Sequence, residues 1–218
     1  MRVLCALDVT DATVDYAIAN GYDTIVSHHP MIFHPLKGVN YTDPTARRVL
    51  KLLKHNISVM SFHTRLDMAP DGLNDVFAKL LELTDVQPLI SGEELIGRIG
   101  TLKAPLDAAQ FASFVKKTLS AERVLFTRGA KQVSRVAICG GDGKDFVEAA
   151  KAAGADSYLT GQLSYNIMLG ASDVGINLFE AGHFHTEDFV CNYLTLVILK
   201  KYTQVQTGYF NSNAVMVV

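Results

Sequence analysis

The chain has 218 residues, of which 49% are hydrophobic and 19% charged, and its formal net charge is −2 at pH 7. This balance is typical of a globular protein with a well-filled core, as one large domain or two small ones. Such a chain lacks the basic footprint of a nucleic-acid-binding protein. It also lacks an apolar run of the ~18 residues that a membrane helix needs. The three cysteines lack the paired spacing of a metal site, so we expect buried thiols in a reducing compartment. No signal peptide is visible, which predicts a cytoplasmic location.

The elements predicted along the chain alternate between strands and helices. Helix starts are indicated by Thr10 or Asp11 and by Asp43-Pro44, because these residues suit an N-cap or a first turn. The expected strands are 2–7, 24–27, 56–62, 97–102 and 124–127, and the expected helices are 11–20, 43–55, 73–81 and 106–119. This alternation predicts α/β architecture with largely parallel strand pairing.

Two parts of the chain read alike. Residues 4–27 and 137–160 both follow the order strand, helix, Gly-x-Asp, strand, and residues 56–63 and 175–183 both read as a strand that ends at histidine. These matches predict two similar α/β lobes related by an internal repeat. Lobe 1 is expected at about 1–95 plus the C-terminal strand and lobe 2 at about 96–205, within one domain over 1–218. The alternative is that any two strand-helix-strand units look alike.

Three short histidine-bearing segments, at 27–30, 63–67 and 182–187, each follow a predicted strand. Ligands of open α/β sheets bind beyond the carboxyl ends of the strands, so two facing lobes are expected to present these segments to one cleft. Imidazole and carboxylate groups are ligands for Zn, Mn, Fe or Mg. The segments offer enough of them for two divalent ions: His28, His29, Asp67, His183 and Glu187.

The first two segments suggest how their side chains share a pocket. A strand end followed by Pro30 can turn both His28 and His29 toward one pocket, where each would bind a different ion. His63 and Asp67 lie four residues apart and share one face if a helical turn follows the strand. Asp67 is the stronger ligand candidate, whereas His63 is a ligand, a partner of a ligand or an acid/base.

The third segment has the same four-residue spacing. His183 and Glu187 are expected on one face at the start of a helix that runs toward Lys201, and Glu187 can bridge two ions with its two oxygens. His185 lies off that face, which favours a supporting role over ligation, and Gly182 would allow close backbone approach. The glycine-rich loop 140–143 is a weak candidate for a phosphate site, against a plain tight turn.

An ordered set of motifs gives the chain a family resemblance over nearly its full length. The motifs are Leu7-Asp8-Val9-Thr10, Ser27-His28-His29-Pro30 with Phe33, His63-Thr64 with Leu66-Asp67, Gly72-Leu73-Asn74-Asp75, Gly140-Gly141-x-Gly143, Thr160-Gly161, and Gly182-His183 with Thr186-Glu187. With them the chain resembles the dinuclear-metal-centre family whose bacterial members are called GTP cyclohydrolase 1 type 2 homologues, relatives of the NGG-interacting-factor proteins.

The resemblance implies two similar lobes, a ring-shaped homohexamer and two metal ions inside the ring. It maps the family's ligands onto the five residues already named from chemistry, with Glu187 bridging. This chain departs from the family at Arg65, where Asn is frequent, and at Gln162, where Glu is frequent. It also begins at the first strand, where relatives usually carry a longer N-terminal segment. These departures affect the expected substrate and the expected subunit assembly, whereas the expected metal ligands are unchanged.

The sequence therefore predicts a dinuclear metal-dependent hydrolase with a nucleotide-like substrate. Two divalent ions per subunit, zinc first and Fe, Mn, Ni or Mg as alternatives, would lower the pKa of a water from 15.7 toward ~7. Glu187 and His63 are the expected catalytic residues, with His63 moving the proton. The resemblance implies ring opening of GTP at C8. The alternatives are a phosphoester or nucleotide hydrolase at the same site, and a metal-binding assembly or regulatory protein with little turnover.

Overall fold

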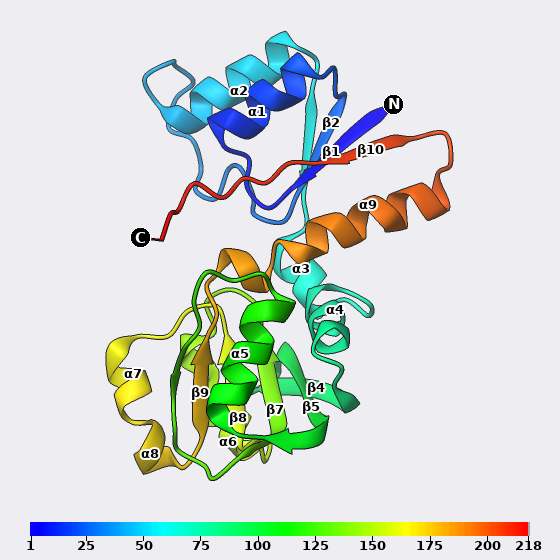
Figure 1. Ribbon diagram of the computed structural model, residues 1–218. Coiled ribbons are helices and arrows are strands. Elements are labelled where there is room, and N and C mark those ends of the chain that lie inside the picture. The colour runs from blue at the N-terminus through cyan, green and yellow to red at the C-terminus, as the bar shows by residue number, and fades with distance from the viewer. Residues whose placement is uncertain (218) are drawn as a thin grey trace. The chain divides into compact units, whose positions relative to one another are not determined.

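The computed structural model describes residues 1–217 and divides into two compact units. Unit 1 combines Met1–Leu66 with Asp188–Met216, and unit 2 is the continuous segment Asp67–Glu187. Each unit contains its own β-sheet with helices packed against it (Figure 1). Within residues 1–217, no helix combines the length and the apolar character that a membrane crossing requires.

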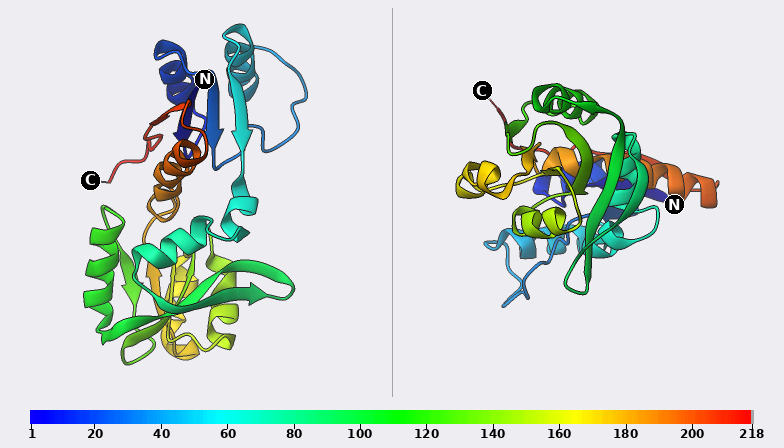
Figure 2. Two further views of the ribbon diagram at one scale, coloured as in Figure 1. Left: turned by 90° about the vertical axis from the view of Figure 1, so that its right-hand side faces the viewer. Right: turned by 90° about the horizontal axis from the view of Figure 1, so that it is seen from below.

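Unit 1 is built on a four-stranded parallel sheet with the strand order β10-β1-β2-β3. Its elements are β1 (Arg2–Ala6), α1 (Asp11–Ala19), β2 (Thr24–Ser27), α2 (Pro44–Lys54), β3 (Ser58–Ser61), α9 (Phe189–Lys201) and β10 (Gln206–Tyr209). Both chain ends therefore contribute to one sheet, since β10 pairs with β1. In Figure 2 the strands of this sheet run side by side, with α1 and α2 packed over them.

The helix starts of unit 1 agree with the sequence signals. Thr10 forms a capping box with Thr13, and its side chain accepts a hydrogen bond from the Thr13 amide at 3.1 Å. Asp43 caps α2 by accepting from the Ala46 amide at 2.7 Å, and Pro44 occupies the first turn. These caps satisfy amides that have no partner inside the helix. The sequence-based starts of both helices are thus confirmed.

The core of unit 1 lies between the sheet and its two N-terminal helices. Leu4 of β1, Ile25 of β2 and Val59 of β3 point to the same face of the sheet and pack with Val14 of α1 and Leu52 of α2. Because side chains alternate along a strand, the intervening residues face the other side, where α9 packs against β1 and β10. The three carboxyl ends of β1, β2 and β3 meet at one edge of this sheet.

Unit 2 is built on a six-stranded mixed sheet with the order β4-β5-β7-β8-β9-β6. Its strands are β4 (Thr84–Ser91), β5 (Glu94–Leu106), β6 (Leu125–Thr127), β7 (Val133–Cys139), β8 (Ser157–Thr160) and β9 (Asn177–Glu180). Its helices are α4 (Leu73–Leu80), α5 (Ala108–Thr118), α6 (Val147–Ala152), α7 (Tyr165–Leu169) and α8 (Ala171–Val174), with 3-10 turns η1 (Lys144–Phe146) and η2 (Phe184–Thr186). A short helix, α3 (His63–Met68), begins in unit 1 and ends in unit 2.

The division of the chain differs from the lobes expected at about 1–95 and 96–205. Strand β4 was not predicted, and it pairs antiparallel with β5, so residues 67–95 belong to unit 2. Helix α9 packs on β1 and β10, which places residues 188–205 in unit 1. Only β7, β8 and β9 are parallel in the second sheet, because the long β5 pairs antiparallel with β7.

The two units share a pattern of backbone hydrogen bonds. The Asp23 amide donates to the Arg2 carbonyl at 2.9 Å, and the Asp156 amide donates to the Arg135 carbonyl at 3.0 Å. Both bonds tie the Gly-x-Asp turn to the start of the preceding strand, β1 in one unit and β7 in the other. This is the pattern that an internal repeat predicts.

The same agreement extends to the strand ends. The His63 amide donates to the His28 carbonyl at 2.9 Å, and the Gly182 amide donates to the Gly161 carbonyl at 3.1 Å. The equivalent of His63 in unit 2 is therefore Gly182, and His183 lies one residue further along the chain. Both units place their candidate ligands just past the ends of the equivalent parallel strands.

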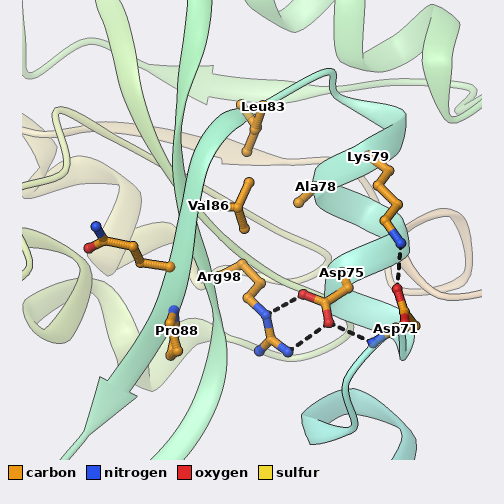
Figure 3. Close-up of a pocket in the computed structure, with 9 residues that line it drawn as sticks. Asp71, Asp75, Ala78, Lys79, Leu83, Val86, Pro88 and Arg98 are labelled. Carbon is orange, nitrogen blue, oxygen red and sulfur yellow. Dashed lines mark hydrogen bonds and ion pairs between the residues drawn. The ribbon is translucent and has the colours of Figure 1, made fainter.

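Helix α4 is fixed to the sheet of unit 2 by an ion pair (Figure 3). The Arg98 guanidinium on β5 donates to both carboxylate oxygens of Asp75 on α4, at 2.5 and 3.1 Å. Arg98 also donates to the Gly97 carbonyl, and its side chain is only 8% exposed. Apolar residues of α4 and β4, including Ala78 and Val86, line the small cavity beside this pair. The pair thus sets the position of α4 against β5.

Candidate metal centre

Three imidazoles gather at the carboxyl edge of the sheet in unit 1. His28 and His29 follow β2, and His63 follows β3, so the parallel pairing of these strands brings the three residues together. Their rings lie 5.1 to 5.6 Å apart, centroid to centroid. One ring nitrogen from each lies within 4.8 Å of the others. Imidazole nitrogens at this spacing could hold a divalent metal ion.

The backbone around the histidine pair is held by several hydrogen bonds. The His29 amide donates to the Leu7 carbonyl at 3.0 Å, and the Ser27 hydroxyl donates to the His29 carbonyl at 2.8 Å. The Ser27 and Ser61 hydroxyls also contact each other at 2.7 Å. His28 is fully buried, whereas His29 is partly exposed. The turn after β2 therefore presents both rings from a rigid backbone.

Unit 2 carries the candidate ligands His183 and Glu187. His183 Nε2 lies 3.0 Å from Glu187 Oε2, and His183 Nδ1 lies 2.7 Å from the Gln162 side-chain oxygen. An amide oxygen only accepts, so Nδ1–H is the donor to Gln162, and Nε2 is the ring atom that faces the carboxylate. Two electron-pair donors at this spacing suit a shared cation. The donor set of unit 2 therefore fits a divalent metal ion.

Glycine at position 141 makes room for this pair. Gly141 has φ +68°, and a Cβ there would lie 2.2 Å from Glu187 Oε1 and 3.3 Å from His183 Nε2. The Gly141 amide donates to the Thr186 hydroxyl at 3.1 Å. The Thr186 hydroxyl in turn lies 3.0 Å from the His183 carbonyl, to which it can donate. The loop after β7 thus forms a cradle for the carboxylate that only glycine permits.

Asp67 is the third candidate ligand of unit 2. It lies in the last turns of α3, and its carbonyl accepts a hydrogen bond from Asn74 Nδ2 at 3.2 Å. Burial, together with the negative charges of Asp67 and Glu187, raises the pKa of the Cys139 thiol to about 12. The backbone of Asp67 is tied to α4 through Asn74.

The helical turn expected after His63 is confirmed by α3, but the third segment differs from its prediction. His183 and Glu187 flank the 3-10 turn η2 and precede α9, so they do not lie on the first turn of that helix. The four-residue spacing still brings their side chains together. His185 forms a close contact with Glu122, so its supporting role stays a prediction. Gly182 has φ +88°, as a close backbone turn requires.

The weak phosphate prediction for loop 140–143 is not supported, because three of its amides already donate to side chains. The Gly140 amide donates to Asn74 Oδ1, the Gly141 amide to the Thr186 hydroxyl, and the Gly143 amide to the Thr160 hydroxyl. A phosphate would have to displace these bonds. The loop instead serves as the tight turn that shapes the Glu187 cradle.

The structure also reveals residues that the site prediction did not include. Asp8 Oδ1 lies 2.8 Å from His29 Nδ1, Gln162 contacts His183, and Asn74 links the Asp67 segment to Gly140. The position of Asp8 could have been recognised from the sequence, because Asp8 follows β1 at the same sheet edge where His28 and His29 follow β2. Asn74 belongs to the Gly72-Leu73-Asn74-Asp75 motif, but its role at the site could not be predicted, because it depends on where α4 packs.

The fold and these side-chain sets define the class of protein. The model of the Duf34/NIF3 (NGG1p interacting factor 3) family matches residues 1–214. The chain belongs to this family, as the motifs that follow its strands suggested.

Its relatives agree with this assignment. Proteins named GTP cyclohydrolase 1 type 2 homolog are 34% identical in Nostoc sp. and 35% identical in Streptococcus pneumoniae. The alignments cover 88% and 87% of this chain and 75% and 74% of those proteins. A solved Staphylococcus aureus hypothetical protein has the same fold, with a TM-score of 0.88 at 24% identity over 99% of this chain and 87% of its own. A Bacillus cereus protein related to NIF3 gives 0.87 at 22% identity, over 100% and 89%.

Proposed function

We propose that this protein is a dinuclear metal-dependent hydrolase that acts on a nucleotide-like substrate. The observation that carries the proposal is the pairing of imidazole and carboxylate donors at the strand ends, with His183 Nε2 3.0 Å from Glu187 Oε2. The proposed ligands of two divalent ions are His28, His29, Asp67, His183 and Glu187. Zinc is the first candidate, because the set combines nitrogen and oxygen donors, and Fe, Mn, Ni or Mg are the alternatives.

In this proposal Glu187 would be a ligand of both ions. Bound divalent ions would supply Lewis acidity and bring the pKa of water from 15.7 toward ~7. His63 is the proposed proton carrier, since its ring lies 5.4 Å from that of His28, at the edge of the ligand set. An imidazole titrates near neutral pH and suits proton transfer there.

The proposed reaction is ring opening of GTP or a related purine nucleotide. The support is the name of the relatives, GTP cyclohydrolase 1 type 2 homolog, together with the hydrolytic chemistry of the donor set. A panel of nucleotides tests the reaction class directly. Release of formate from GTP would support ring opening, and release of phosphate would indicate phosphoester hydrolysis. Metal binding without turnover of any nucleotide would indicate a metal-binding assembly or regulatory protein.

The metal content of the purified protein tests the centre itself. We expect about two ions per chain in the wild type and fewer in Glu187→Gln, because the substitution removes the shared carboxylate. Glu148→Gln is the matched control, since Glu148 is exposed on α6 of the same unit. An unchanged metal content in Glu187→Gln would contradict the proposed ligand set, and absence of metal in the wild type after addition of Zn²⁺ would contradict the function.

We further propose that the protein assembles as a homohexamer in the cytoplasm. Apolar side chains on α9 support self-association, since Leu196 is 65% exposed and Val197 is 40% exposed. Met60 on β3 is 54% exposed on the sheet face opposite the N-terminal helices. A parallel sheet is normally covered on both faces, so we propose that a second copy of the chain covers the exposed part of this face around Met60. The three cysteines are all buried, which suits a reducing compartment.

A further inference from the structure

We infer that Asp8 is a positioning residue of the metal centre, which holds His29 in the tautomer that presents Nε2 to a metal ion. The inference rests on the proposed function, because it takes His29 as a ligand. Asp8 follows β1, and its Oδ1 lies 2.8 Å from Nδ1 of His29 after β2. The parallel pairing of β1 with β2 sets this contact, because both residues follow strands that end at the same edge.

The chemistry of the two groups fixes the direction of the hydrogen bond. A carboxylate accepts and does not donate, so the proton on His29 must reside on Nδ1. The neutral ring then carries its lone pair on Nε2, the nitrogen on the side away from Asp8. Carboxylate–histidine–metal arrangements orient the ring and raise its basicity in this way.

Asp8 is itself held from several directions. Its amide donates to the Ser212 hydroxyl at 3.1 Å, and that hydroxyl donates to Asp8 Oδ2 at 3.3 Å. The Thr13 hydroxyl donates to the Asp8 carbonyl at 2.8 Å. Ser212 is only 8% exposed and lies 204 residues away in sequence. The second carboxylate oxygen is thus occupied, which leaves Oδ1 directed at His29.

The other candidate ligand histidine has a partner of different charge. His183 Nδ1 faces the neutral amide of Gln162, whereas His29 Nδ1 faces an anion. Both partners select the same tautomer, but only Asp8 adds negative charge behind the ring. Removal of the Asp8 charge should therefore weaken metal binding through His29 without removing a ligand.

The tautomer of His29 can be measured in the metal-free protein by long-range ¹⁵N–¹H correlation spectra. We expect His29 to be protonated at Nδ1 in the wild type. In Asp8→Ala the constraint is lost, so the Nε2-protonated form should increase. In Asp8→Asn the amide oxygen can still accept from Nδ1–H, as that of Gln162 does at His183, so the tautomer should be kept while the negative charge is lost. Asp15→Asn is the control, because Asp15 lies on α1 of the same unit and pairs with Lys51 at the surface.

Zn²⁺ affinity, measured by competition with a chelator, gives the second readout. Loss of such a partner typically costs 10–100-fold in metal affinity, so we expect that decrease in Asp8→Asn and Asp8→Ala, a smaller one in Ser212→Ala, and none in Asp15→Asn. Thermal unfolding of each metal-free variant shows whether the fold is kept, and the Zn²⁺ affinity of Asp8→Asn serves if Asp8→Ala unfolds.

The outcomes separate the two proposals. A wild type that binds two ions, with an unchanged His29 tautomer in Asp8→Ala and an unchanged Zn²⁺ affinity in Asp8→Asn, would overturn the role of Asp8 and leave the metal centre standing. A wild type that binds no Zn²⁺ would overturn the proposed function, while the tautomer spectra would still decide whether Asp8 sets the protonation of His29.

Discussion

The side chain of Asn74 accepts a hydrogen bond from the Gly140 amide at 3.1 Å, across 66 residues of sequence. Its Nδ2 group donates to the Asp67 carbonyl at 3.2 Å. One buried amide therefore joins the end of α3 to the loop that shapes the Glu187 cradle. The spacing of the unit 2 ligands depends on α4, the helix that carries Asn74.

Replacement of Asn74 by Ala should loosen both segments at once. The change leaves a buried amide and a buried carbonyl without their partner, which costs about 1–3 kcal/mol in the free energy of unfolding. Metal affinity should fall as well, because Asp67 and Glu187 lose their fixed spacing. Chemical denaturation and Zn²⁺ competition measure the two effects. Asn20→Ala, at an exposed helix end, should change stability by less than ~0.5 kcal/mol and leave Zn²⁺ binding unaffected.

Gly141→Ala tests the cradle with an internal control. The added Cβ would lie 2.2 Å from Glu187 Oε1, so the carboxylate must move and metal binding should fall at least tenfold, by analogy with loss of a supporting group. Gly154 also has positive φ, +83°, but has no atom within 4 Å of an added Cβ. Gly154→Ala therefore carries a similar backbone strain of about 1 kcal/mol without the contact.

Equal Zn²⁺ affinities in Gly141→Ala and Gly154→Ala would contradict the cradle. Equal losses of stability together with a selective loss of metal affinity in Gly141→Ala would support it.

The Arg98–Asp75 pair should stabilise unit 2 in a pH-dependent way. Asp75→Asn leaves the buried Arg98 guanidinium without its counter-charge, which should cost roughly 3 kcal/mol at pH 7. Replacement of both residues, as in Asp75→Leu with Arg98→Met, should cost much less. The exposed Asp71–Lys79 pair is the control, and Asp71→Asn should change stability by less than ~1 kcal/mol.

The sign of the pH effect follows from the pKa of Asp75. Burial alone would raise this pKa, but the hydrogen bond and charge of Arg98 lower it by more. A carboxyl whose pKa is lowered on folding stabilises the fold above its unfolded pKa of about 3.9. That contribution is lost as the pH falls through the lower folded value. Urea unfolding at pH 7, 4 and 3 should show the difference between wild type and Asp75→Asn shrinking only at the lowest pH; a constant difference would contradict the assignment.

Leu196→Glu tests whether α9 carries the proposed assembly surface. A charge in an apolar subunit contact should reduce the mass measured by light scattering, while the circular dichroism spectrum stays unchanged. Leu53→Glu is a closely matched control, because Leu53 is 68% exposed on α2 and Leu196 is 65% exposed. A reduced mass in Leu53→Glu alone would place the contact on the N-terminal helices instead.

Local chemistry predicted much of unit 1, because its elements follow strong signals. The caps at Thr10 and Asp43 define helix starts, and buried apolar runs define β1 and β2. Unit 2 was harder to predict, since β4 has exposed side chains at most of its positions and pairs with β5 at the sheet edge. A strand of that kind lacks the apolar alternation that sequence reading requires.

The candidate site shows the same contrast between residues that the sequence reveals and residues that only the structure reveals. Histidine and carboxylate residues after strands are visible in sequence, because metal ligands are few and chemically distinct. The supporting bonds of Asp8, Gln162 and Asn74 depend on which segments pack together, so only the tertiary structure shows them. The sequence comparison aligned His183 with His63, whereas the backbone hydrogen bonds give Gly182 the position in unit 2 that His63 has in unit 1.

The sheet of unit 1 contains the first and the last strands of the chain, and this arrangement sets an order of maturation. Unit 2 is one continuous segment and can fold while the C-terminal residues are still being synthesised. Unit 1 has neither β10 beside β1 nor Ser212 beside Asp8 until residues 206–212 have been synthesised. Its histidines therefore acquire their full support only after all of unit 2 has been synthesised.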